Sequence, residues 1–176
     1  MTDISEVFPL GRYTRPTVFT AETRARAIDD IEAMPTHLRQ AVDGLNDRQL
    51  DAPYRAGGWT VRQVTHHVTD AHINAYVRTR LALTEHNPTI KPFDQNQWSE
   101  LTDARQQPVA TSLALIDALH QRWVTLLRSL TPADFARPFV HPESGPLTVD
   151  QLVAEYAWEG QHHVAQITSL RQRAGW

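Results

Sequence analysis

The sequence predicts an all-α fold, an up-down four-helix bundle with long crossover connections, formed by a single domain over residues 1–176. Four segments place apolar residues three and four positions apart, which is the spacing of one helix face. Two of these segments begin with a Thr-x-x-Gln capping box, and long polar stretches separate several of them. A length of 176 residues, with 41% hydrophobic and 21% charged residues, suits one globular domain with one core.

The N-terminal part predicts an arm followed by a helix in two pieces. Residues 1–20 contain two prolines and no periodicity, so we expect an extended arm. Thr20 is a candidate N-cap for a helix over residues 21–34. We expect Pro35 to open a second helical piece, because the first residue of a helix does not need its N–H group. The apolar positions of the two pieces are Ile28, Ile31, Met34, Leu38, Val42 and Leu45.

The second long helix is predicted from its cap onwards. A Gly-Gly pair precedes it, and Thr60 with Gln63 forms the first capping box. The helix is expected to end at about Thr84, with apolar positions at Val64, Val68, Ala71, Ala75 and Leu81. Residues 85–107 hold two prolines and many polar groups. A connection of this length in one domain is usually functional or mobile.

The C-terminal half predicts two further helices. Pro108 can open the third, whose apolar face comprises Val109, Leu113, Ile116, Leu119, Trp123, Leu127 and Leu130. Residues 131–148 are rich in turn formers, with a short hairpin expected around residues 143–145. Thr148 begins the second capping box, and the last helix is expected to run to about Arg173.

Composition argues against several classes of function. The formal net charge is −3 and the basic residues are scattered, so no nucleic-acid partner is expected. No apolar run is long enough to span a membrane, and the first residues lack the pattern of a secretory signal. Cysteine is absent, which excludes disulfides, thiolate ligands and a cysteine nucleophile, and fits a cytoplasmic location. Neither a phosphate-binding glycine loop nor a G-x-S-x-G hydrolase turn is present.

The stretch "YAWEGQHHVAQI" (156–167) places polar residues where a helix should be apolar. Steps of three and four join Glu159 and His163 to the apolar positions Leu152, Tyr156, Ile167 and Leu170. His67 interrupts the apolar face of the second helix in the same way. Since an unpaired buried carboxylate is costly, such groups are normally paired or bound to a metal. His67, Glu159 and His163 are therefore candidate ligands of one ion.

Two imidazoles and one carboxylate suit a divalent ion such as Zn²⁺, Ni²⁺, Mn²⁺ or Fe²⁺, one per chain. Three protein ligands leave coordination positions free, as in catalytic sites. A buried ion pair of Glu159 with His163, or with an arginine, is the alternative. Glu159 and His162 also form a Glu-x-x-His pattern, but the second copy that a di-metal carboxylate site needs is absent.

Other residues could complete the site. Asp70 could orient a ligand from the second coordination shell, and His72 could flank the site, although a solvent-facing position is the plainer interpretation of both residues. Arg78 could bind a carboxylate or phosphate, its alternative being a salt bridge at the end of the bundle. Trp59 could wall the pocket or belong to the core. We expect His66 and His162 at the surface or an interface, and no role is predicted for His37, His86 and His120.

Two blocks of sequence carry a family resemblance. They are "YRAGGWTVRQVTHHVTDAHINAYVRTRLALTEHNPTIKPFDQNQW" (54–98) and "FVHPESGPLTVDQLVAEYAWEGQHHVAQITSLRQRAGW" (139–176). Both resemble the DinB/YfiT group of metal-dependent hydrolases, and most closely its bacillithiol-transferase branch. That resemblance implies a DinB-like bundle, a homodimer, and a divalent metal held by three histidines.

Carried over residue by residue, the resemblance assigns the first ligand to His67 and the last to His163. The middle ligand of the family is a histidine, and here that position is Glu159. An anionic donor lowers the charge of the metal centre by one, which favours a harder ion such as Mn²⁺ or Fe²⁺.

The resemblance implies transfer of a low-molecular-weight, bacillithiol-like thiol to an electrophilic substrate, with the metal binding the thiolate. The first alternative is a hydrolase, in which a metal-bound hydroxide attacks an amide or ester. A non-catalytic metal-binding helical module is the second alternative.

Overall fold

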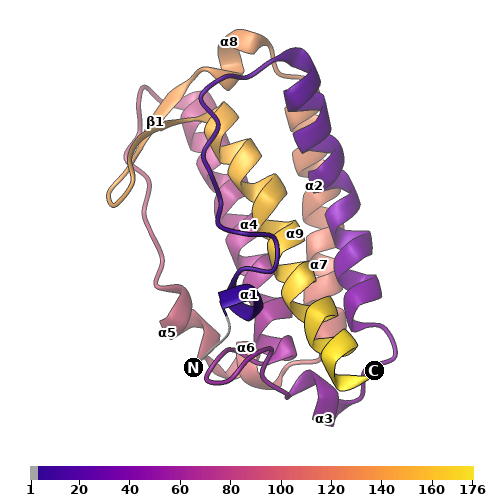
Figure 1. Ribbon diagram of the computed structural model, residues 1–176. Coiled ribbons are helices and arrows are strands. Elements are labelled where there is room, and N and C mark those ends of the chain that lie inside the picture. The colour runs from indigo at the N-terminus through magenta and orange to yellow at the C-terminus, as the bar shows by residue number, and fades with distance from the viewer. Residues whose placement is uncertain (1–3) are drawn as a thin grey trace.

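The computed structural model describes residues 4–176, in which four long helices form a bundle (Figure 1). These are α2 (Ala21–Val42), α4 (Val61–Thr84), α7 (Val109–Arg128) and α9 (Val149–Ala174). The predicted four-helix bundle is confirmed. Of the helices in the described part of the chain, none combines the length and apolar character needed to cross a membrane.

The helices are arranged so that the first two lie diagonally opposite each other. Both α2 and α4 pack against α7 and α9. In Figure 1, α2 and α9 run from top to bottom, whereas α4 and α7 run from bottom to top. The connection after α4 therefore crosses the full length of the bundle, and α4 and α7 become parallel neighbours. This crossover places α4 beside α9, the two helices that carry the predicted ligands.

Short elements decorate the connections. The N-terminal arm holds α1 (Ile4–Val7), and α3 (Asp47–Leu50) follows α2. The crossing connection contains α5 (Gln95–Ser99) and α6 (Thr102–Gln106), and α8 (Pro132–Phe135) follows α7. Strands β1 (Pro138–His141) and β2 (Gly145–Thr148) form the predicted hairpin, antiparallel with Pro138 opposite Thr148. Thr89 forms an isolated bridge with Val140 of β1, which ties the crossing connection to the hairpin.

The predicted helix starts are confirmed by their caps. The side chain of Thr60 accepts from the backbone N–H of Gln63, and that of Thr148 accepts from Gln151, each with the reciprocal bond of a capping box. Thr20 caps α2 in the same way. These bonds satisfy N–H groups that have no partner inside the helix.

The prediction that Pro35 begins a separate helical piece is wrong, because α2 is continuous through it. A proline inside a helix removes the hydrogen bond to the carbonyl four residues earlier, here Ile31. The Nδ1 of His120, on α7, lies 2.5 Å from that carbonyl oxygen and donates to it. A side chain from the neighbouring helix thus replaces the missing N–H.

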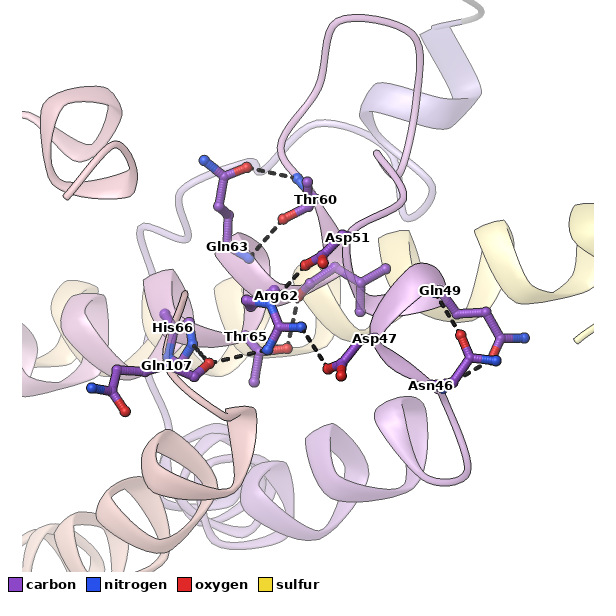
Figure 2. Close-up of polar contacts among 11 residues, drawn as sticks. Asn46, Asp47, Gln49, Asp51, Thr60, Arg62, Gln63, Thr65, His66 and Gln107 are labelled. Carbon is purple, nitrogen blue, oxygen red and sulfur yellow. Dashed lines mark hydrogen bonds and ion pairs between the residues drawn. The ribbon is translucent and has the colours of Figure 1, made fainter. Parts of the chain in front are cut away.

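The start of α4 is held by a buried arginine (Figure 2). The Arg62 side chain donates to Asp51 at 2.7 Å, to Asp47 at 2.9 Å and to the backbone carbonyl of Gln107 at 3.1 Å. His66, one turn further along, shares that carbonyl at 3.1 Å. Figure 2 shows these groups converging from α3, α4 and the end of the crossing connection. The ion pairs fix the first two turns of α4, where His67 also lies.

Polar side chains lie between two apolar clusters. One cluster contains Ile28, Ile31, Ala71, Trp123 and Tyr156, and the other contains Met34, Leu38, Val64, Ile116 and Ile167. Along each long helix the change of cluster occurs near mid-length. His67, His120, Glu159 and His163 lie near this boundary, so the bundle contains a polar layer enclosed by apolar packing.

Candidate metal centre

The three predicted ligands come from neighbouring helices. His67 projects from α4, and Glu159 and His163 lie one turn apart on α9. One nitrogen or oxygen atom from each of the three lies within 4.8 Å of the others. His67 is 6% exposed, and the side chains of Glu159 and His163 are 16% and 12% exposed. The structure therefore brings the three groups together at a mostly buried point.

The two carboxylate oxygens of Glu159 have different neighbours, and Oε1 is the one that faces the other two predicted ligands. Its Oε1 lies 3.5 Å from Nε2 of His67 and 3.3 Å from Nε2 of His163. Charge-assisted hydrogen bonds are shorter, about 2.7–2.9 Å. Ligand atoms at about 2.0–2.2 Å from Zn²⁺ in a tetrahedral arrangement lie about 3.3–3.6 Å apart. The spacing at Oε1 is therefore that of co-ligands, and it fits a shared cation better than a direct ion pair.

The pKa shifts favour the metal-binding forms of Glu159 and His67, whereas His163 has a proton that a metal ion has to displace. Burial alone would raise the pKa of Glu159, but the charge of His163 and the contacts with the three surrounding imidazoles hold this pKa well below its usual value. Burial lowers the pKa of His67 and favours its neutral form. Burial also opposes the charge of His163, yet Glu159 and Gln166 outweigh it and raise the His163 pKa. A cation would replace the proton on His163 in balancing the carboxylate.

The residue Gln166 fixes His163. Its Oε1 lies 2.8 Å from Nδ1 of His163 and accepts from it, which leaves Nε2 of His163 free to bind a metal. The amide nitrogen of Gln166 lies 3.0 Å from the backbone carbonyl of Val7 and 3.0 Å from Nε2 of His162. Two acceptors on that side leave only the oxygen to face His163. The N-terminal arm therefore takes part in orienting a ligand.

The other oxygen of Glu159 is bound by an imidazole pair, His72 and His120. Nε2 of His72 lies 3.0 Å from Oε2 of Glu159, and Nδ1 of His72 lies 2.9 Å from Nε2 of His120. The pair ends at the carbonyl of Ile31, which Pro35 leaves without its helical donor. Both rings are buried, and together they connect α9 to α2 through α4 and α7.

The imidazole pair also orients Glu159. With Oε2 held by Nε2 of His72, Oε1 is the oxygen that faces Nε2 of His67 and Nε2 of His163. The pair therefore supports the carboxylate from the side opposite the two other predicted ligands.

A glycine allows α2 and α9 to approach at this layer. A Cβ atom at Gly160 would lie 2.5 Å from Cγ of Met34, closer than such atoms approach in proteins. The same Cβ would lie 3.5 Å from the ring of His72. The missing side chain therefore lets the buried Met34 and His72 pack beside Glu159.

Two pockets border the site. One of about 610 Å³ is lined by His67, Glu159, Tyr156, Arg78 and Phe93, among others. A second, of about 360 Å³, is lined by Trp59, His163 and Glu159, together with Phe8 and Val7 of the arm. The Trp59 ring lies 4.6 Å from the ring of His67 and 6.5 Å from that of His163. Small-molecule sites commonly have volumes in this range.

Of the other residues predicted to complete the site, three lie at it and one does not contact the ligands as expected. His72 contacts Glu159 directly, Trp59 walls the ligands, and Arg78 lines the larger pocket. Asp70 does not orient His67: among the described residues no hydrogen bond joins the two side chains. Burial and the nearby Asp103 raise the pKa of Asp70 to about 6.

The surface placement expected for His66 and His162 is wrong, since both are 6% exposed. Ser112 and the carbonyl of Gln107 enclose His66, and Trp158 stacks on His162 at 4.5 Å between ring centroids. The contacts of His120 and Gln166 with this site were not predicted from the sequence. Only the spacing of Gln166, three residues after His163, could have indicated its role.

Comparison with known proteins identifies the family of this chain. The family model of the DinB superfamily matches residues 30–167. A Bacillus mycoides protein named "Putative metal-dependent hydrolase" is 50% identical and covers 96% of this chain and 97% of its own length. An Oceanobacillus iheyensis protein of the same description is 48% identical, over 98% of this chain and all of its own length.

A solved structure is also similar. YfiT from Bacillus subtilis, described as "a probable metal-dependent hydrolase with an unusual four-helix bundle topology", superimposes with a TM-score of 0.95. It is 44% identical, and the match covers 98% of this chain and 99% of YfiT. The chain therefore belongs to the DinB superfamily and has the YfiT-like four-helix bundle.

Proposed function

We propose that this protein is a metal-dependent hydrolase that holds one divalent ion through His67, Glu159 and His163. The observation that carries the proposal is the spacing of Oε1 of Glu159 from Nε2 of His67, 3.5 Å, and from Nε2 of His163, 3.3 Å, which fits co-ligands of one ion better than short charge-assisted hydrogen bonds. The names of the relatives support the same activity.

When bound, the ion supplies a Lewis acid and lowers the pKa of water held beside it. The protein contributes the rest. Gln166 holds the His163 ring with Nε2 toward the site, and the imidazole pair holds Glu159 so that only Oε1 faces the other ligands. Trp59 and Phe93 lie against His67 and limit the access of bulk water. The larger pocket supplies room for an amide or ester substrate.

Thiol transfer is the second candidate, and it stays a prediction. The absence of cysteine favours it in one respect, since any nucleophilic sulfur has to come from a cosubstrate. The pocket of about 610 Å³ can accept a small thiol together with an electrophile. Homodimer formation, a cytoplasmic location and the bacillithiol-transferase branch likewise stay predictions.

The test is an activity screen on protein prepared without a histidine tag. Chelated protein is reloaded separately with Zn²⁺, Ni²⁺, Mn²⁺ or Fe²⁺ and assayed on ester and amide panels, and in parallel on thiols with epoxides and alkyl halides. We expect metal-dependent hydrolysis that Glu159→Ala abolishes and that His86→Ala, an exposed histidine, leaves unchanged. Thiol conjugation without hydrolysis would favour the second candidate. Metal binding with neither activity would favour the non-catalytic module.

A further inference from the structure

Arg78 of α4 is a buried cation that no carboxylate of the described residues contacts directly. It is 8% exposed, and no carboxylate of a described residue lies within ion-pair distance of its guanidinium. Nη1 donates to the Tyr156 hydroxyl at 3.2 Å, and Nη2 donates to the backbone carbonyl of Lys91 at 3.4 Å. A guanidinium has five N–H donors, so three remain without a partner among the described residues. Nε is fully buried and unpaired.

The same helix provides a comparison. Arg62 is 6% exposed, and its ion pairs with Asp47 and Asp51 supply the counter-charge that a buried guanidinium normally requires (Figure 2). Arg24 is likewise paired, with two bonds of 2.7 and 2.8 Å to Asp150. Among the described residues Arg78 has no such direct ion pair, and Glu155 of the same pocket acts on it only from beyond ion-pair distance. Its unused N–H donors can therefore bind an anion that enters the pocket.

The position of Arg78 connects it to the metal centre. It lines the same pocket of about 610 Å³ as His67 and Glu159. Eleven residues separate it from His67, which is about 16 Å along the helix. Since long side chains on a helix lean toward its N-terminus, the guanidinium lies on the order of 10 Å from the ligand atoms. Glu143 and Glu155 line the pocket as well, so Arg78 is the place within it where an anion is favoured.

We propose that the substrate carries a carboxylate or phosphate group, which Arg78 binds at a distance on the order of 10 Å from the bond that is cleaved. This inference rests on the proposed function, because it takes the metal centre as the reacting end of the pocket. Arginine suits both groups through paired N–H donors. An anchor of this kind holds the far end of the substrate and so orients the reacting bond at the metal ligands.

Binding can be measured apart from catalysis. Adipate, monoethyl phosphate and the neutral dimethyl adipate are titrated by calorimetry into metal-free and zinc-loaded protein. We expect one of the two anions to bind both forms, the tighter one identifying the preferred group, and dimethyl adipate to bind at least tenfold more weakly. Arg78→Met should weaken anion binding at least tenfold and Arg78→Lys by less, while Arg80→Met, an exposed arginine of the same helix, should leave it unchanged.

Stability supplies an independent readout. If Arg78 waits for an external anion, Arg78→Met should melt no lower than the wild type in anion-free buffer, whereas Arg62→Met should melt well below it. Anion binding that is unaffected by Arg78→Met, equal binding of dimethyl adipate, or no binding of either anion would overturn the proposal. A lower melting temperature of Arg78→Met without any effect on binding would assign Arg78 a structural role.

The two proposals can fail separately. The p-nitrophenyl monoester of adipic acid and p-nitrophenyl hexanoate differ in a terminal carboxylate, and the first should be hydrolysed with the lower KM in an Arg78-dependent way. Hydrolysis of neither ester, with Arg78-dependent binding of adipate, would refute the hydrolase and keep the anion site. Equal hydrolysis of both esters, unaffected by Arg78→Met, would refute the anion site and keep the hydrolase.

Discussion

Because His120 donates to the carbonyl of Ile31 that Pro35 leaves without a helical donor, we expect substitutions at His120 and Pro35 to have coupled effects on stability. Replacing His120 by Phe removes the donor to that carbonyl and leaves Nδ1 of His72 without its hydrogen-bond partner. Ile31 and His72 are both 0% exposed, so water cannot take over either bond. Each unsatisfied buried group costs about 1–3 kcal/mol, so His120→Phe should destabilise the wild type by about 2–6 kcal/mol.

Pro35→Ala should remove one of these two costs, that of the unsatisfied Ile31 carbonyl. The new residue has an N–H group, which can donate to the Ile31 carbonyl as in any helix. In that background His120→Phe leaves only His72 unpaired, and its cost should fall by about 1–3 kcal/mol. The difference between the two backgrounds is the coupling energy of a double-mutant cycle, in which effects of altered packing at His120 cancel.

The assay is urea unfolding of the four proteins at pH 8 in the presence of a chelator, so that metal binding does not contribute. His120 is neutral there, because burial and the neighbouring His72 lower its pKa to about 3. The exposed His86→Phe serves as a control, with a cost near zero in both backgrounds. Equal costs of His120→Phe in the two backgrounds, within about 0.5 kcal/mol, would refute the role assigned to the Ile31 carbonyl.

Three further predictions concern residues around the site. Gln166→Ala should weaken zinc binding by about 10–100-fold in competition with a chelator, because it frees the His163 ring. Asp70→Asn should stabilise the metal-free protein by about 1–2 kcal/mol in urea at pH 7, a value discounted for partial exposure. The folded-state pKa of Asp70 is raised to about 6, so the stability that its protonated form contributes is fully present below about pH 4 and is lost as the pH rises through 6. The stabilisation by Asp70→Asn should therefore vanish at pH 4. Gly160→Ala gains about 1 kcal/mol of helix propensity but overlaps Met34, and should destabilise by up to about 2 kcal/mol; in a Met34→Ala background it should stabilise instead.

Each of these three predictions would be contradicted by one specific outcome. Unchanged zinc affinity of Gln166→Ala would mean that His163 needs no support from the amide. A gain for Asp70→Asn that persists at pH 4 would arise from something other than the carboxylate's titration. A stabilising Gly160→Ala in the wild-type background would show that Met34 can move aside freely.

The helices could be predicted because their signals are local. Caps such as Thr60 and Thr148 and the three-and-four spacing need only neighbouring residues. Glu159 and His163 could be paired for the same reason, as they lie one turn apart. His67 could be added because it interrupts an apolar face in the same manner, and the structure brings it to the other two.

What the sequence could not provide depends on contacts between distant segments. His120 acquires its partner only because Pro35, on another helix, leaves a carbonyl free. His162 is buried because Trp158 and Phe8 of the arm cover it. Arg78 resembles any helix-end arginine until the structure shows that none of the carboxylates in residues 4–176 forms an ion pair with it. Such facts belong to the packing of the bundle and leave no periodic trace in the sequence.

The metal content of the purified protein is the decisive measurement for the three proposed ligands. Elemental analysis of tag-free protein, after dialysis against a mixture of divalent ions, should find close to one ion per chain in the wild type and in His86→Ala. In Glu159→Ala and His163→Ala it should find almost none, with folding verified by circular dichroism. A metal-free wild type, or variants that retain a full ion, would contradict the assignment of His67, Glu159 and His163 as a metal centre.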